Sequence, residues 1–145
     1  MSNDPHDLRR FADAQSRNYV DALSEIRSGQ KRSHWMWYVF PQYEGLGLSP
    51  MAQRYSIKSV AEADAYLRHP LLGPRLTECA EALLALEGRS AHEIFGSPDD
   101  AKLRSSATLF SRVAPAGSVF HRILDRYFVG EPDRKTLELI GRAAE

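Results

Sequence analysis

Hydrophobic residues recur at helical spacing along most of the chain. Between residues 7 and 28 they fall mainly three or four positions apart, as they do on one face of an α-helix. Gly29 follows at the place of a left-handed C-terminal cap. Residues 71–86 carry a second apolar stripe, which Gly88 ends. The spacing therefore predicts helices over both segments.

Capping signals predict where shorter helices begin. Ser59 with Glu62, and Ser90 with Glu93, have the spacing of a capping box. In such a box the serine oxygen accepts a free N–H and the glutamate reaches back to the cap. Pro70 should end the first of these helices, because the residue before a proline is disfavoured in α geometry.

Serine–proline pairs predict two more helix starts, since serine caps a helix and proline is tolerated at its first position. Ser49-Pro50 should begin a short helix, and Ser97-Pro98 one that reaches about Val113. Two final helices are expected over residues 118–127 and from residue 132 or 133 to 142.

Residues 35–40 form the one segment with the composition of a strand. No second segment offers a pairing partner, so we expect a helical turn that Ser33 caps. Positions two apart on a helix point about 200° apart around its axis. The turn should therefore bury Trp35 and leave Trp37 nearer a cavity or the surface.

Together these elements predict an all-α fold, a single-domain bundle of about six to eight short helices over residues 1–145, with residues 1–6 flexible. Acidic and basic residues number 19 each, which gives no overall field for nucleic acid or an anionic membrane. Cys79 is the only cysteine, and no apolar signal segment begins the chain. We expect a cytoplasmic protein with neither nucleic-acid nor membrane partners.

Residues 31–42 combine both tryptophans of the chain with basic and polar side chains. Aromatic walls bind flat rings, and Lys31 or Arg32 could hold an anionic group beside Trp37. His34 could act as an acid or base near neutral pH, and Gln42 adds a polar ligand-binding candidate. The alternative is that the aromatic residues fill the core and the basic pair is solvated.

The helix predicted to start near residue 97 carries polar residues where a core face is expected. Asp99 can stabilise the helix dipole, and the same carboxylate could polarise water. Lys102, Ser105 and Ser106 lie three and four residues apart and can share a face. Hydroxyl groups are mildly unfavourable inside helices, which favours a binding role. Alternatively, the serines bond back to their own helix.

We expect these two clusters to line one cleft, with His34 or Gln42 within about 10 Å of Asp99, Lys102 or Ser106. No metal or cofactor is expected. The five histidines are widely spaced and match no metal-ligand motif.

Several motifs are specific enough to suggest a family. The longest is the nonapeptide His34–Gln42, and the others are Gly45–Gly47, Tyr66–Leu76, Ile94–Gly96, Asp99–Leu103 and Ser105–Phe110. They resemble a bacterial domain-of-unknown-function family of small proteins, some of which are labelled calpastatin-like. The resemblance covers about residues 7–139 and implies an all-helical domain without an established activity. The capped, apolar helices do not support the calpastatin label, because such inhibitors are long and disordered.

Two hypotheses for function follow. The order of the aromatic segment, a His-Pro helix and a Phe-Gly turn is similar in outline to small helical domains that process ADP-ribose or riboside derivatives. The first hypothesis is therefore a domain that binds or hydrolyses a nucleotide- or ADP-ribose-like molecule, with Asp99 and His34 as catalytic candidates. The second is a non-enzymatic helical protein-interaction module. The sequence leaves the oligomeric state open.

Overall fold

The regular elements of the described part of the chain are helices. The computed structural model describes residues 4–144. Within that range there are nine helices: α1 (Arg9–Ser28), α2 (Met36–Val39), α3 (Pro50–Arg54), α4 (Val60–Arg68), α5 (Leu72–Ala85), α6 (Ala91–Phe95), α7 (Asp99–Ser111), α8 (Val119–Phe128) and α9 (Arg134–Ala144). The all-α prediction is confirmed. Each of these nine corresponds to a segment predicted above as a helix or helical turn, so the range of six to eight was one too low.

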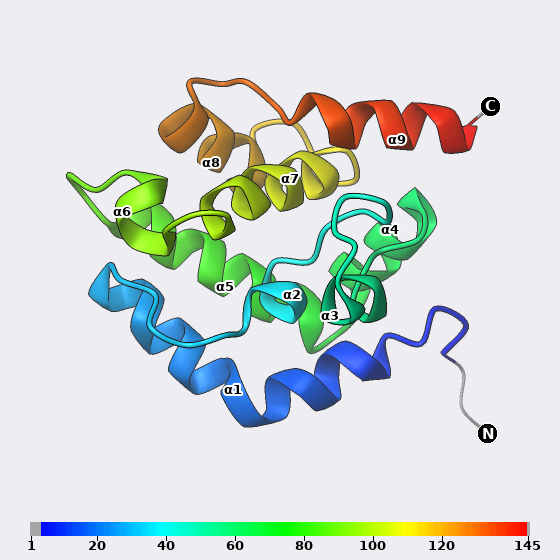
Figure 1. The fold of residues 1–145 in the computed structure, drawn as a ribbon, viewed down its shortest axis with the longest axis horizontal. Coiled ribbons are helices and arrows are strands. Elements are labelled where there is room, and N and C mark those ends of the chain that lie inside the picture. Colours follow the sequence, from blue (N-terminus) through cyan, green and yellow to red (C-terminus); the bar gives the residue numbers. More distant parts are fainter. Residues whose placement is uncertain (1–3, 145) are drawn as a thin grey trace.

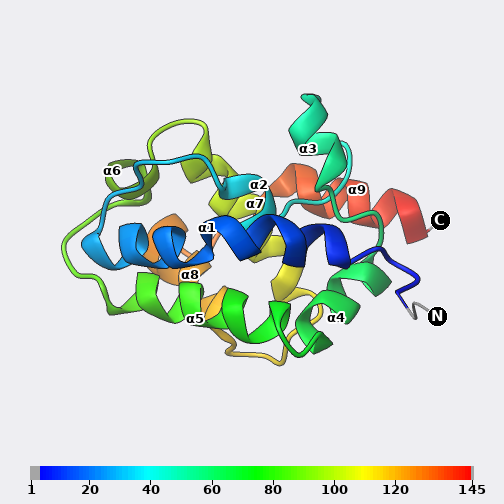
Figure 2. The same ribbon diagram turned by 90° about the horizontal axis from the view of Figure 1, so that it is seen from below.

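The long helices stack around α5. Helix α5 contacts α1 on one side and α8 on the other, and α7 packs against α4, α6, α8 and α9 (Figure 1). Helix α3 projects from this stack in the perpendicular view (Figure 2). None of the helices described between residues 4 and 144 is long and apolar enough to cross a membrane.

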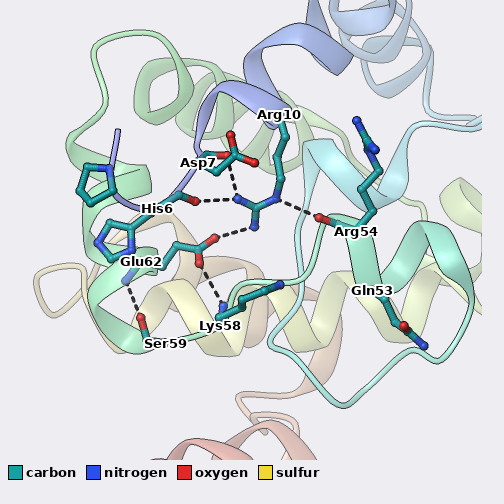
Figure 3. A pocket seen from close by; sticks show the side chains of 9 residues that line it. His6, Asp7, Arg10, Gln53, Arg54, Lys58, Ser59 and Glu62 are labelled. Carbon is teal, nitrogen blue, oxygen red and sulfur yellow. Dashed lines mark hydrogen bonds and ion pairs between the residues drawn. The ribbon is translucent and has the colours of Figure 1, made fainter. Parts of the chain in front are cut away.

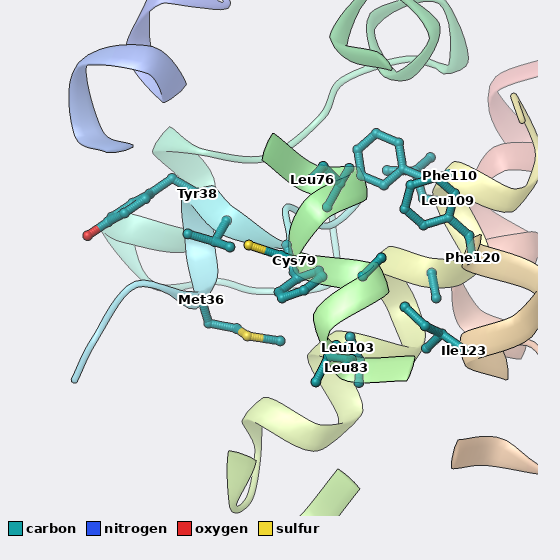
Figure 4. Packing of buried hydrophobic residues seen from close by; sticks show 14 of the residues in the cluster. Met36, Tyr38, Leu76, Cys79, Leu83, Leu103, Leu109, Phe110, Phe120 and Ile123 are labelled. Atoms are coloured by element: carbon teal, nitrogen blue, oxygen red, sulfur yellow. The ribbon is translucent and has the colours of Figure 1, made fainter. Parts of the chain in front are cut away.

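The core holds large aromatic residues from several helices. Side chains of α2, α5, α7 and α8 converge on it (Figure 4). Trp35 and Phe40, at the two ends of α2, are among its largest fully buried side chains. Trp37, between them, is only partly buried. The predicted difference between the two tryptophans is thus confirmed, and residues 35–40 form a helical turn and not a strand.

Several predicted caps are confirmed. Gly29 ends α1 in the left-handed conformation, with φ 78°. Ser90 and Glu93 form a complete capping box on α6. Ser59 caps α4 with its hydroxyl, but Glu62 does not return to the backbone of Ser59. Its carboxylate instead accepts hydrogen bonds from Arg10 and from the Lys58 N–H, so a tertiary partner replaces half of that box.

Two predicted caps are wrong. Ser33 does not cap a helix at His34, because its hydroxyl donates to Glu25 and α2 begins only at Met36. The Ser97-Pro98 pair does not start α7 as predicted. Pro98 itself takes the N-cap position, with φ −92° and ψ 9°, and the helix begins one residue later. At Ser33 a longer-range contact thus prevails over the local signal.

Of the segment predicted to be flexible, residues 1–6, the first three lie outside the described residues. Asp4 is tied to the start of α1, where its carboxylate accepts the backbone N–H groups of Leu8 and Arg9 at 2.8 and 2.9 Å.

Candidate functional site

The loop that leads from α1 into α2 is held by the carboxylate of Glu25. This group accepts hydrogen bonds from the backbone N–H groups of Arg32 and Ser33, from the Ser33 hydroxyl and from the Trp35 indole N–H. Partial burial alone would raise the pKa of Glu25, but these four donors outweigh it and lower the pKa to about 2. The carboxylate therefore stays ionised and fixes the loop that carries Lys31.

Lys31 crosses from this loop to the start of α7. Its backbone N–H donates to the Ile94 carbonyl at 2.7 Å. Its Nζ lies 2.9 Å from Asp99 Oδ2 and 5.1 Å from the centre of the Trp35 ring, and its side chain is only 7% exposed. The lysine thus joins the aromatic segment to the helix that carries the second predicted cluster.

Lys102 makes the second link between the two segments. Its Nζ lies 3.4 Å from Asp99 Oδ1 and 5.3 Å from the centre of the Trp37 ring. The Asp99 side chain is 18% exposed and that of Lys102 is 23% exposed. Two ammonium groups therefore share one carboxylate beside a partly exposed indole, which leaves a local surplus of positive charge. We call Lys31, Trp37, Asp99 and Lys102 the α2–α7 site.

The hydroxyl groups of α7 divide between the two predicted alternatives. Ser105 donates to the Ala101 carbonyl at 3.1 Å, one turn back in its own helix. Ser106 is fully buried, and among the described residues its Oγ has no hydrogen-bond partner. It follows Lys102 by one turn, on the stripe that begins at Asp99. Ser105 thus has the structural contact that the alternative predicts, whereas Ser106 does not.

The remaining predicted site residues have no direct link to these groups. Arg32 and His34 are exposed, and Gln42 is partly buried. No hydrogen bond or ion pair joins their side chains to Asp99 or Lys102 within residues 4–144. The expected approach of His34 or Gln42 to within about 10 Å of α7 stays a prediction.

Sequence reasoning missed Glu25, which organises the loop before α2. Nothing in its local pattern distinguishes it from the other glutamates of the helices. Across the described part of the chain, no group of three or more His, Cys, Asp or Glu side chains is placed to hold a metal ion. The candidate chemistry of the site is therefore that of ammonium groups, a carboxylate and an indole ring.

Comparison with known proteins identifies the family. The model of the family described as "Protein of unknown function (DUF1810)" matches residues 5–140. The chain belongs to this family. It is also 53% identical to the conserved hypothetical protein Rv1873 from Mycobacterium tuberculosis, whose crystal structure it matches with a TM-score of 0.93 over 95% of this chain and 99% of that one. No curated protein matches the chain. The family resemblance is thus confirmed, and these relatives support the fold without naming an activity.

Proposed function

We propose that this protein binds a small anionic molecule with a flat ring, of the nucleotide or ADP-ribose class, at the α2–α7 site. The contacts of Lys102 are the main observation behind this proposal. Its ammonium group lies over the Trp37 ring and against Asp99, so one side chain adjoins both an aromatic surface and an excess of positive charge. A ligand with an anionic group and a ring would use both features.

The charge of the site supports an anionic ligand. Lys31 and Lys102 both contact Asp99, and all three side chains are at least three-quarters buried. One carboxylate neutralises only one of the two ammonium groups. Because charges interact more strongly where water is partly excluded, an anion placed beside Lys102 would be attracted more than at an open surface.

The indole supports a ring in the ligand. Trp37 is partly exposed, whereas its neighbour Trp35 is fully buried. An aromatic ring placed against the exposed part of Trp37 would bury apolar surface of both partners, and stacked rings attract one another beyond that burial. The same ligand could then extend its anionic group toward Lys102.

The contacts of Asp99 favour binding over hydrolysis. Each of its two oxygens faces an ammonium group, at 2.9 and 3.4 Å. A general base must accept a proton from water or substrate, and a carboxylate paired on both oxygens is poorly prepared for that. In the proposed function Asp99 therefore orients the two lysines, and we assign no hydrolytic step.

A protein-interaction module is the second candidate, and one observation favours it. Leu48, just before α3, and Met51, in its first turn, have 81% and 37% of their surface exposed. This segment projects from the rest of the molecule (Figure 2). Neighbouring exposed apolar side chains are typical of contact surfaces.

A thermal-shift titration with AMP and with ADP-ribose tests the proposal. At a concentration of about 100 times Kd, a ligand that binds only the folded state adds about 2.7 kcal/mol, or roughly 10 °C in Tm. Lys102→Met keeps the aliphatic stem but removes the ammonium group, and should abolish the shift. Lys135→Met, at an exposed lysine of α9, is the matched control and should retain it.

Three outcomes would count against the proposal. One is that neither probe raises Tm at any concentration up to about 10 mM, the weak end of small-ligand affinity. Another is that Lys102→Met retains the full shift. The third is that both lysine variants lose the shift equally, which would indicate binding by general charge and not by the α2–α7 site.

A further inference from the structure

A cavity of about 520 Å³ lies between the N-terminal turn, α1, and the segment from α3 to α4. Figure 3 shows the guanidinium of Arg10 between the turn that carries His6 and Asp7 and the segment that runs from Arg54, at the end of α3, to Lys58. None of the residues of the α2–α7 site lines it. The two regions can therefore be tested independently.

Hydrogen bonds hold the Arg10 guanidinium in place against this cavity. Its Nε donates to the Arg54 carbonyl at 2.9 Å, and one Nη donates to the carbonyls of His6 and Asp7 at 2.7 and 2.8 Å. The other Nη donates to the Ser56 carbonyl at 2.8 Å and to the Glu62 carboxylate at 2.7 Å. The guanidinium thus ties the walls of the cavity together and has no donor nitrogen left over for a ligand.

Glu62 should repel an anion in this cavity less than an unpaired carboxylate would, because both of its oxygens already accept hydrogen bonds. One of its oxygens accepts from Arg10 and the other from the Lys58 backbone N–H at 3.2 Å. The side chains of Arg10 and Glu62 are only 10% and 3% exposed, so their charges compensate one another below the cavity surface. The charge that a ligand meets is set by the residues around them.

The surrounding side chains carry more positive than negative charge. Arg54 and Lys58 are both exposed and outnumber Asp7. The Arg54 Nε donates to the Tyr55 hydroxyl at 3.3 Å and the Lys58 Nζ to the Ser56 hydroxyl at 3.2 Å. Neither cation is paired with a carboxylate within residues 4–144. Both keep donors for a ligand.

We infer that this cavity binds the phosphate group of a small polar phosphomonoester, such as a sugar phosphate. Arginine and lysine are the side chains that proteins use to bind phosphate oxygens. Of the nine lining residues only Pro5 is apolar, so the part of the ligand that adjoins the phosphate should be polar and not a flat aromatic ring. The volume lies within the usual range of small-molecule sites.

NMR titration of the ¹⁵N-labelled full chain with ribose 5-phosphate tests this inference. We expect saturable shifts of the backbone amides of His6, Asp7, Lys58 and Ser59, with unphosphorylated ribose giving none at equal ionic strength. The double variant Arg54→Gln, Lys58→Gln should bind at least tenfold more weakly, because it removes two charged donors.

A control variant and a replacement variant complete the titration. Lys135→Gln removes an exposed charge elsewhere and should leave the affinity unchanged. If the double variant does not fold, as judged by its amide spectrum, the single variant Lys58→Gln replaces it. The inference fails if no saturable shift occurs up to about 50 mM, well beyond useful small-ligand affinity. It also fails if ribose alone gives the same shifts, or if loss of Lys58 leaves the affinity unchanged.

Discussion

Replacing Glu25 with glutamine tests the idea that one carboxylate organises the candidate site. The pKa of Glu25 falls from 4.5 to about 2 in the folded state. At about 1.36 kcal/mol per pKa unit this difference corresponds to roughly 3.4 kcal/mol of stability. The carboxylate is only partly buried, so solvent screening reduces that figure. We expect Glu25→Gln to lose about 1–2 kcal/mol at pH 7.

The stability that Glu25 contributes should fall as the pH is lowered. The pKa is lower in the folded than in the unfolded state, so the contribution of Glu25 is fully present above pH 4.5 and is lost as the pH falls toward 2. A protonated glutamate resembles the glutamine of the variant. The difference in unfolding free energy between the two proteins should therefore shrink from pH 5 downward.

Urea unfolding at pH 7, 5, 4 and 3 measures this difference. Glu87→Gln is the matched control, at an exposed glutamate just beyond α5, and should change the unfolding free energy by less than about 0.5 kcal/mol. The reasoning is refuted if Glu25→Gln is as stable as the unchanged protein at pH 7. It is equally refuted if the difference stays constant between pH 7 and pH 3.

Three further predictions concern the core. Trp35→Ala should lower the unfolding free energy by about 3–5 kcal/mol and Trp37→Ala by clearly less, and the reverse order in urea unfolding would contradict the burial of the two rings. Gly73→Ala should lower the unfolding free energy by about 1–3 kcal/mol, because its new Cβ overlaps a backbone carbonyl of α4. At Gly141 in α9, by contrast, a new Cβ meets no atom of the described chain within 4 Å, so Gly141→Ala should raise the unfolding free energy by about 0.5–1 kcal/mol. Burial raises the pKa of the Cys79 thiol to about 12, so a thiol reagent should label Cys79 only on unfolding, and rapid labelling of the native protein would count against its burial.

Local signals in the sequence predicted most of the helices. The apolar stripe over residues 7–28 and the glycine after it correspond to α1 and its left-handed cap. The Ser90–Glu93 pair forms the capping box that its spacing indicates. These features depend on hydrogen bonds and side-chain contacts within about four residues, so the neighbouring residues alone contain the needed information.

Local signals failed where a distant group competes for the same atoms. The Ser33 hydroxyl fits a cap, yet Glu25 takes its hydrogen bond. The Glu62 carboxylate fits a capping box, yet Arg10 reaches it from another helix. In each case a contact made by packing replaces one that adjacent residues would make, and the spacing of residues gives no sign of the replacement.

The sequence by itself determined which segments are helical, and it correctly indicated that Trp35 is buried more deeply than Trp37. It also singled out the two clusters of the candidate site by residue type. Only the tertiary structure decided which members of those clusters meet: Lys31 and Lys102 converge on Asp99. Such a meeting depends on how α1, α2 and α7 pack, and the packing is set by the whole core at once rather than by any short stretch of chain.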